Sequence, residues 1–125
     1  MYFGLSEDQI FFQDNVKKFL EDNAPLDAVK KITEGADVAT KDELHQGLIN
    51  LGINNILIPE ENGGLGLDLL FASAVSQSLG EGIATLPFVG PYVIAPIAIK
   101  YGASDSQKEK LFNEISQNLI NCGVG

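Results

Sequence analysis

Hydrophobic residues recur every three or four positions along most of the chain, which is the spacing of one face of an α-helix. The first such segment follows Ser6, which forms a helix-opening capping box with Gln9. The residue before Pro25 is disfavoured in a helix, so the segment is expected to end there. Its inner face is predicted to hold Phe12, Val16, Phe19 and Leu20. Its outer face is predicted to hold Gln13, Asp14, Lys17 and Lys18.

The same spacing predicts two helices in the next part of the chain. A short helix is expected over residues 26–32, where a break of small and acidic residues follows. A longer helix is expected to open at Thr40, which heads a second capping box with Glu43. Gly52 is the expected end of that helix, because glycine suits a left-handed C-terminal cap.

Three further helices are expected after residue 67. One begins at Asp68 and runs to about Leu79, where Gly80 and Gly82 stop it. The next runs over residues 91–102, with a kink or a delayed start at its second proline, Pro96. The last follows Ser104, which heads a third capping box.

Two segments between the helices depart from the helical pattern. Residues 53–58 are rich in isoleucine, but no second convincing strand lies nearby, so we interpret them as a buried extended connector. Residues 59–66 are predicted to form a turn-rich loop. The chain is therefore expected to be all-α, an irregular bundle of about five or six helices.

The composition of the chain excludes several classes of protein. The chain has 125 residues and a formal net charge of -9, which repels nucleic-acid phosphates and excludes nucleic-acid binding. Cys122 is the single cysteine, so no internal disulfide can form and a reducing, cytoplasmic location is expected. Residues 82–99 are uncharged, but Pro87, Pro91 and Pro96 interrupt them, so no membrane span is expected.

No combination of side chains indicates an active site. His45 is the single histidine and is interpreted as a solvated helix residue rather than a general base. One histidine and one cysteine, far apart in sequence, make a metal site improbable. Residues 63–66 are rich in glycine but fail both phosphate-binding fingerprints, so turns with positive φ are preferred over a phosphate cradle. The adjacent Glu60 and Glu61 are expected to be solvated.

Three motifs nevertheless resemble one enzyme family in their order and spacing. Residues 5–9, leading into the first helix, resemble the opening helix of acyl-CoA dehydrogenases. Residues 48–53, followed by Pro-Glu-Glu-Asn-Gly-Gly-Leu-Gly at 59–66, are similar to that family's N-terminal signature, and this second run is the most specific. Residues 102–110 resemble a later helix start. From the first motif to the last, the resemblance extends over nearly the whole chain.

The resemblance implies a three-domain enzyme that removes two hydrogens across the α and β carbons of an acyl-CoA thioester. In that family a glutamate takes the α proton, and FAD accepts a hydride from the β carbon. The resemblance assigns residues 1–118 to the N-terminal helical domain and residues 119–125 to the start of the connection to a β-domain. No catalytic, cofactor-binding or metal-binding residue is carried over. We therefore expect a domain fragment that is inactive and binds no FAD by itself.

The resemblance also predicts one substrate-binding surface. In the family, the helix before the Gly102 turn lines the fatty chain, and the matching wall residues here are Val89, Val93, Ile94 and Ile97. Such side chains suit an acyl tail, because burial is worth about 0.8 kcal/mol per methylene. The alternative is that they pack the core of the domain itself. The nearly uninterrupted apolar character of residues 90–99 favours a surface covered by other parts, and so an exposed apolar patch on this chain.

The expected partners follow from the same resemblance. They are an acyl-CoA substrate, further subunits of a homo- or hetero-oligomer, and an electron-transferring flavoprotein as redox partner. A second interpretation stays open, in which the chain is a free-standing helical module that mediates subunit association or binds an acyl group without redox activity.

Overall fold

The computed structural model describes residues 4–124, and that range contains six α-helices and no β-strand, which confirms the all-α prediction. The chain divides into two compact units. One takes the chain up to Leu51 together with Ser73–Leu86, and the other takes Gly52–Ala72 together with the chain from Pro87 onward. The predicted division at residue 118 stays a prediction, and the terminal residues 1–3 and 125 that it includes lie outside the described residues.

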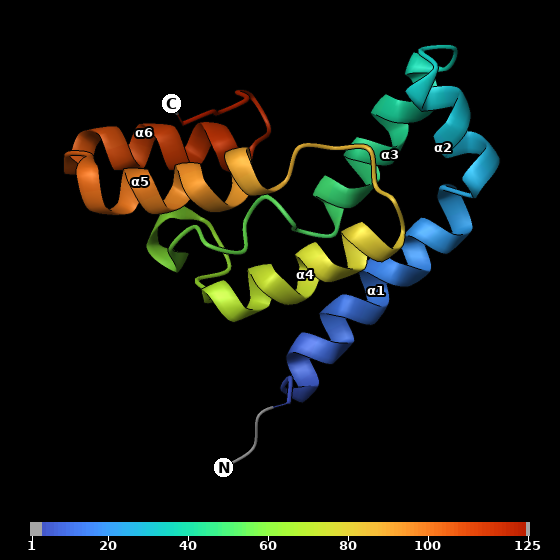
Figure 1. Ribbon diagram of the computed structural model, residues 1–125. Coiled ribbons are helices and arrows are strands. Elements are labelled where there is room, and N and C mark those ends of the chain that lie inside the picture. Colours follow the sequence, from blue (N-terminus) through green and yellow to red (C-terminus); the bar gives the residue numbers. More distant parts are fainter. Residues whose placement is uncertain (1–3, 125) are drawn as a thin grey trace. The chain divides into compact units, whose positions relative to one another are not determined.

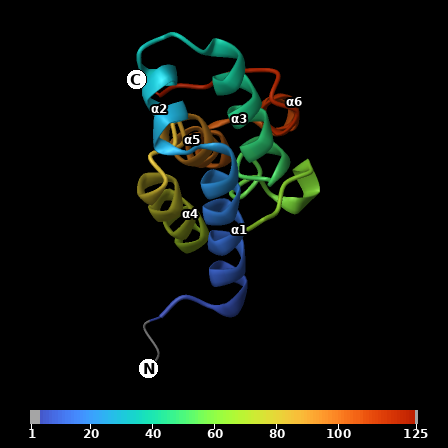
Figure 2. The ribbon, with the colours of Figure 1, turned by 90° about the vertical axis from the view of Figure 1, so that its right-hand side faces the viewer.

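The first unit is built from three helices and most of a fourth. They are α1 (Glu7–Asn23), α2 (Leu26–Thr33), α3 (Val38–Asn50) and the part of α4 (Leu69–Glu81) that begins at Ser73. In Figure 2, α3 and α4 both lie next to α1. The buried apolar residues of this unit are Val16, Leu20, Ala24, Val29, Ile32, Leu44, Leu48, Ile49, Ala74, Val75 and Leu79.

Helix α1 begins where the capping box places it. The Ser6 hydroxyl accepts the Gln9 N–H, and the Gln9 side chain accepts the Ser6 N–H at 2.9 Å, so two N–H groups of the first turn are satisfied. Helices α1 and α2 end close to their predicted positions, at Asn23 and Thr33.

The prediction that Gln13 lies on the outer face of α1 is wrong. Gln13 is only 7% exposed, and its Nε2 donates to the Ala74 carbonyl of α4 at 2.9 Å. In return the Ser78 hydroxyl donates to the Gln13 carbonyl at 3.2 Å. The buried side-chain amide is tolerated because its N–H group finds the Ala74 carbonyl, and the Ser78 bond satisfies the backbone carbonyl of the same residue. Helix α1 thus buries Gln9, Gln13, Val16 and Leu20, whereas Phe12 and Phe19 are half-buried.

The predicted start of α3 at Thr40 is also wrong. The helix begins at Val38 with Asp37 as its N-cap. The Asp37 carboxylate accepts the Thr40 N–H at 3.0 Å and the Thr40 hydroxyl at 2.7 Å. Asp37 therefore binds both groups that Thr40 would need for a cap of its own, and the helix gains its extra residues at that end. The expected left-handed end at Gly52 is confirmed by its φ of 91°.

The second unit contains the remaining elements. They are a 3₁₀ turn η1 (Glu60–Asn62), a π-helical turn η2 (Val89–Ile94), α5 (Ala95–Gly102) and α6 (Asp105–Ser116). Helices α5 and α6 lie side by side in Figure 1, and α6 opens with the predicted Ser104 capping box. The buried apolar residues of this unit are Ile53, Ile56, Ile58, Ala72, Phe88, Tyr92, Ala95, Phe112 and Ile115.

The connector over residues 53–58 is buried as predicted, but it is turned rather than extended. Asn55 N–H donates to the Gly52 carbonyl at 3.0 Å, which closes a turn at its start. Asn54 is 1% exposed, and its Nδ2 donates to the carbonyls of Ile115 and Ser116 at the end of α6. The connector is therefore fixed by an asparagine that satisfies carbonyls a helix end leaves open.

Helix α4 is longer than predicted. The Asp68 carboxylate accepts the Phe71 N–H at 3.1 Å, which confirms the expected start. Of the two predicted stops, Gly80 is wrong because it lies inside the helix, whereas Gly82 directly follows the last helical residue, Glu81. Glycine lowers helix stability by only about 1 kcal/mol, which tertiary packing overrides here.

Candidate functional site

The predicted pocket wall lies on η2 and α5, where two prolines shape the backbone. Proline has no N–H and cannot make the normal helical bond, so Pro91 and Pro96 leave gaps in the hydrogen-bond pattern. The Ala95 N–H instead donates to the Gly90 carbonyl five residues back, which is a π-helical bond. Regular α-helix begins at Ala95, with Pro96 in its first turn. Pro96 thus delays the start of the helix, as predicted.

The structure places the predicted wall residues in two environments. Val89, Ile94 and Ile97 are 50%, 45% and 36% exposed, whereas Val93 is half-buried. The opposite side of the same segment is closed, since Phe88, Tyr92, Ala95 and Pro96 are buried. The side chains of Val89, Ile94 and Ile97 are therefore not part of the buried core of their unit.

Two residues that the sequence analysis did not select extend this surface. Ala98 and Tyr101 lie one helical turn beyond Ile94 and Ile97, and Tyr101 is 80% exposed. The Lys100 Nζ lies 5.7 Å from the centroid of the Tyr101 ring, within cation–π range. Helical spacing from Ile97 was the signal that could have found Tyr101. We call the exposed set Val89, Ile94, Ile97, Ala98 and Tyr101 the α5 apolar face.

Tyr92 supports the α5 apolar face from beneath. Its ring lies 6.4 Å from that of Phe88 in a tilted arrangement, and its hydroxyl lies 3.4 Å from Asn118 Oδ1. Burial, followed by the nearby Cys122, raises the pKa of Tyr92 above its usual value. The hydroxyl therefore stays protonated and serves as a hydrogen-bonding group rather than a base.

The glycine-rich loop is not a phosphate cradle. Each backbone N–H of residues 63–66 donates inside the protein: Gly63 to Glu60, Gly64 to Pro59, Leu65 to Asn55 and Gly66 to Ile58. A phosphate site at such a loop needs free N–H groups that point at the anion. The predicted positive φ angles are confirmed at Gly63 and Gly66, with 84° and 61°.

Close packing explains the remaining glycine of the loop. A Cβ at Gly64 would collide with the carbonyl and side chain of Ile58. The loop therefore needs glycine at this position for contact with the connector, independently of any ligand.

A polar hollow of about 310 Å³ lies beside the same loop. Glu60 and Glu61 line it together with Lys100 of α5, a neighbour that the sequence analysis did not identify. Both glutamates are exposed, as predicted. The two carboxylates would repel a phosphate, so the hollow does not suit a nucleotide either.

The remaining candidates show no catalytic arrangement. His45 is half-buried on α3, and desolvation lowers its pKa despite the nearby Asp42. Desolvation, followed by Glu114, raises the pKa of the half-buried Cys122 thiol, which disfavours the nucleophilic thiolate. Within residues 4–124, no group of three His, Cys, Asp or Glu side chains could hold a metal ion. No helix in the described range is long and apolar enough to cross a membrane.

Comparison with known proteins gives one match. Residues 6–118 match the family model described as "Acyl-CoA dehydrogenase, N-terminal domain". No curated protein and no solved structure matches the chain. The matched range includes all the helices from α1 to α6, the glycine-rich loop and the α5 apolar face.

Proposed function

Because the chain belongs to the acyl-CoA dehydrogenase family, as the N-terminal domain, we propose that it serves FAD-dependent α,β-dehydrogenation of an acyl-CoA thioester. In this proposal it supplies part of the acyl-pocket wall and a subunit-packing surface, and it is inactive by itself. Residues 1–118 form the domain, and residues 119–125 begin the connection to a β-domain.

The exposure of the α5 apolar face is the observation that supports an acyl-binding surface over residues that pack the core of the domain itself. A core residue of a folded domain is almost fully buried, but Val89, Ile94 and Ile97 are between 36% and 50% exposed. Contiguous apolar side chains on a surface mark sites where another apolar group binds. A fatty chain fits this requirement, because each methylene removed from water contributes about 0.8 kcal/mol.

The glycine-rich loop and the hollow beside it do not fit a flavin diphosphate. All the N–H groups of the glycine-rich loop are already used, and the neighbouring hollow carries Glu60 and Glu61. The proposal therefore places no FAD contact on this loop and assigns no catalytic step to any residue of the chain. FAD belongs to the family's reaction, in which it accepts a hydride.

Methyl NMR spectroscopy of the chain with octanoyl-CoA tests the wall. We expect the methyl resonances of Val89, Ile94 and Ile97 to shift with the acyl-CoA and to stay in place with CoA alone. Val38 and Leu119 are the matched controls, since both are exposed and lie away from this face in sequence. Equal shifts at Val38 and Leu119, or no shift at the face, would contradict the proposed wall.

An absorbance spectrum with added FAD tests the remainder of the proposal. We expect no stoichiometric yellow complex with the chain alone. Bound flavin would show that the chain builds a cofactor site by itself. Acyl-CoA binding without any association with a flavin domain would favour the free-standing module instead.

The proposal also covers the wider setting. It includes a homo- or hetero-oligomer, an electron-transferring flavoprotein as electron acceptor, and a reducing cytoplasm, which the single free cysteine suits.

A further inference from the structure

A groove of about 360 Å³ lies in the first unit, whereas the residues of the α5 apolar face belong to the second unit. It is formed by the C-terminal parts of α1 and α4 and the start of α2, and we call it the α1–α4 groove. The residues that line it are Lys17, Leu20, Glu21, Ala24, Leu26, Val29, Ser78, Glu81, Gly82 and Ile83.

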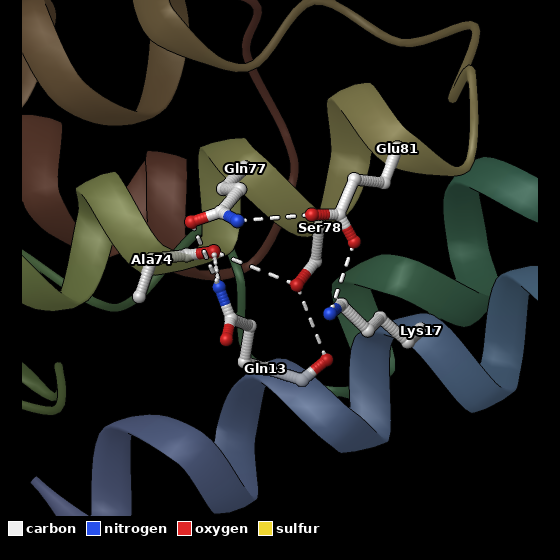
Figure 3. A network of polar contacts seen from close by, with 6 residues as sticks. All are labelled: Gln13, Lys17, Ala74, Gln77, Ser78 and Glu81. Carbon is white, nitrogen blue, oxygen red and sulfur yellow. Dashed lines mark hydrogen bonds and ion pairs between the residues drawn. The ribbon is translucent and has the colours of Figure 1, made fainter. Parts of the chain in front are cut away.

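A polar network holds the two long helices in place along the groove (Figure 3). Gln13 of α1 donates to the Ala74 carbonyl of α4, and its own backbone carbonyl accepts from the Ser78 hydroxyl. Further along, the Lys17 Nζ lies 3.0 Å from Glu81 Oε2, and Gln77 donates to Glu81 Oε1 at 2.9 Å. These contacts therefore connect the two helices that form the walls of the groove.

The floor of the groove is apolar and tightly packed. Leu20, Ala24 and Val29 are buried. At Gly82 a Cβ would lie 2.5 Å from Leu20 Cδ1, so glycine allows the end of α4 to approach α1 closely. An apolar side chain placed on this floor would lose part of its contact with water.

The rim of the groove carries an excess of negative charge. Its carboxylates are Glu21 and Glu81, and its one cation among the lining residues, Lys17, is already paired with Glu81. Both α1 and α4 end here without a basic residue in the last turn, although a helix C-terminus carries about half a negative charge. The N-terminus of α2 also reaches the groove, but Asp27 in its first turn offsets that positive end. A cation on the rim would complement this field.

Ile83 gives an independent indication that the groove binds something apolar. It adopts a left-handed backbone with φ of 51° directly after α4, which is an outlier for a β-branched residue. Two other helices of the chain end with the same pair of backbone bonds, and there the left-handed residue is Gly35 or Asn118. Ile83 is 57% exposed, so burial in the core does not explain the choice. The strained position instead adds an apolar side chain to the groove rim.

We propose that the α1–α4 groove docks a basic amphipathic segment of a partner protein. One apolar side chain of that segment lies on the Leu20 floor beside Ile83, and a neighbouring arginine or lysine pairs with Glu21. The negative rim disfavours fatty acids and the phosphates of acyl-CoA, which separates this groove from the proposed acyl wall. This inference does not rest on the proposed dehydrogenase function.

The test uses the whole 125-residue chain and two synthetic peptides. One is a helical peptide of about 12 residues with leucine on one face and arginine on the other, and the second carries glutamate in place of arginine. In methyl NMR spectra we expect the basic peptide to shift Leu20, Val29 and Ile83, and binding to weaken with salt. The acidic peptide is expected to leave these methyl groups unchanged.

Two variants with a matched control identify the groove. Glu21→Gln should weaken binding of the basic peptide about two- to fivefold. Glu109→Gln changes the net charge equally, lies in the other unit, and should have no effect. Ile83→Asn, which installs the residue type found at the end of α6, should keep the fold while weakening binding by about threefold.

Several outcomes would overturn the proposal. Equal weakening by Glu21→Gln and Glu109→Gln would show that only the net charge attracts the peptide. Shifts with both peptides, or with neither, would show that the groove does not select a basic apolar segment. A concentration-dependent dimer in sedimentation experiments that Glu21→Gln abolishes would assign the groove to a second copy of the chain instead.

Discussion

Gly64→Ala tests how much the contact between the glycine-rich loop and the 53–58 connector stabilises the second unit, because the backbone at Gly64 lies very close to Ile58. The new Cβ would collide with Ile58, whose carbonyl belongs to the backbone and cannot rotate away. The loop would have to move off the connector. The bonds at risk run from the N–H groups of Leu65, Gly66 and Leu67 to the carbonyls of Asn55, Ile58 and Ile56.

The expected cost follows from those bonds. Each contributes about 0.5–1.5 kcal/mol, so their loss gives a decrease of about 1.5–4.5 kcal/mol in the free energy of unfolding. Gly63→Ala is a close control, because an added Cβ there meets nothing within 4 Å and only the φ of 84° opposes it. That backbone strain costs about 1–2 kcal/mol. Gly80→Ala, in open space inside α4, should stabilise the chain by about 0.5–1 kcal/mol.

Urea denaturation followed by circular dichroism and tyrosine fluorescence measures all the variants. Tyrosine emission is informative because buried Tyr92 lies in the same unit as Gly64. The reasoning predicts the order Gly64→Ala, Gly63→Ala, wild type, Gly80→Ala, from least to most stable. If Gly64→Ala costs no more than Gly63→Ala, the loop yields easily and its contact with Ile58 does not constrain the fold.

Three further predictions address other parts of the chain. Asn54→Ala should lower the free energy of unfolding by about 1–3 kcal/mol in urea titrations, because two carbonyls at the end of α6 lose their donor. Ile94→Ser should change it by less than about 0.5 kcal/mol, whereas Ile115→Ala should cost about 2–5 kcal/mol; similar costs would place Ile94 in the core. The hydrogen bond from Lys17 lowers the pKa of Glu81, so the stabilisation it gives is present at neutral pH and lost as the pH falls through that lowered value. The urea midpoints of wild type and Glu81→Gln should therefore converge in acid, and a constant difference would contradict the ion pair.

Helix starts were predictable from the sequence where the signal is local. The capping boxes at Ser6 and Ser104 each need only four consecutive residues, and both form as expected. Thr40 failed because Asp37 lies three residues before it and offers a stronger acceptor to the same N–H. Two overlapping local signals compete there, and the sequence pattern does not weigh a carboxylate against a hydroxyl.

Buried polar residues could not be predicted, because their partners are distant in sequence. Gln13 bonds to Ala74 and Asn54 bonds to Ile115, both 61 positions away. Periodicity assigns such residues to solvent by their type alone. The candidate site shows the same limit, since the pattern of residues 90–99 was apolar all round and only the structure separates buried Tyr92 from exposed Ile94.

The residues that follow helices α2, α4 and α6 can be compared, because all of them adopt the same left-handed backbone conformation. Helices α2, α4 and α6 finish with the same two backbone bonds, and each needs a left-handed residue just beyond the last turn. Gly35 and Asn118 meet that need at low cost. Ile83 meets it with strain, because a β-branched residue is disfavoured at φ of 51°. Stability therefore does not account for isoleucine at this position. The proposed docking of an apolar side chain in the α1–α4 groove accounts for isoleucine here, because the exposed Ile83 side chain lies on the rim of that groove.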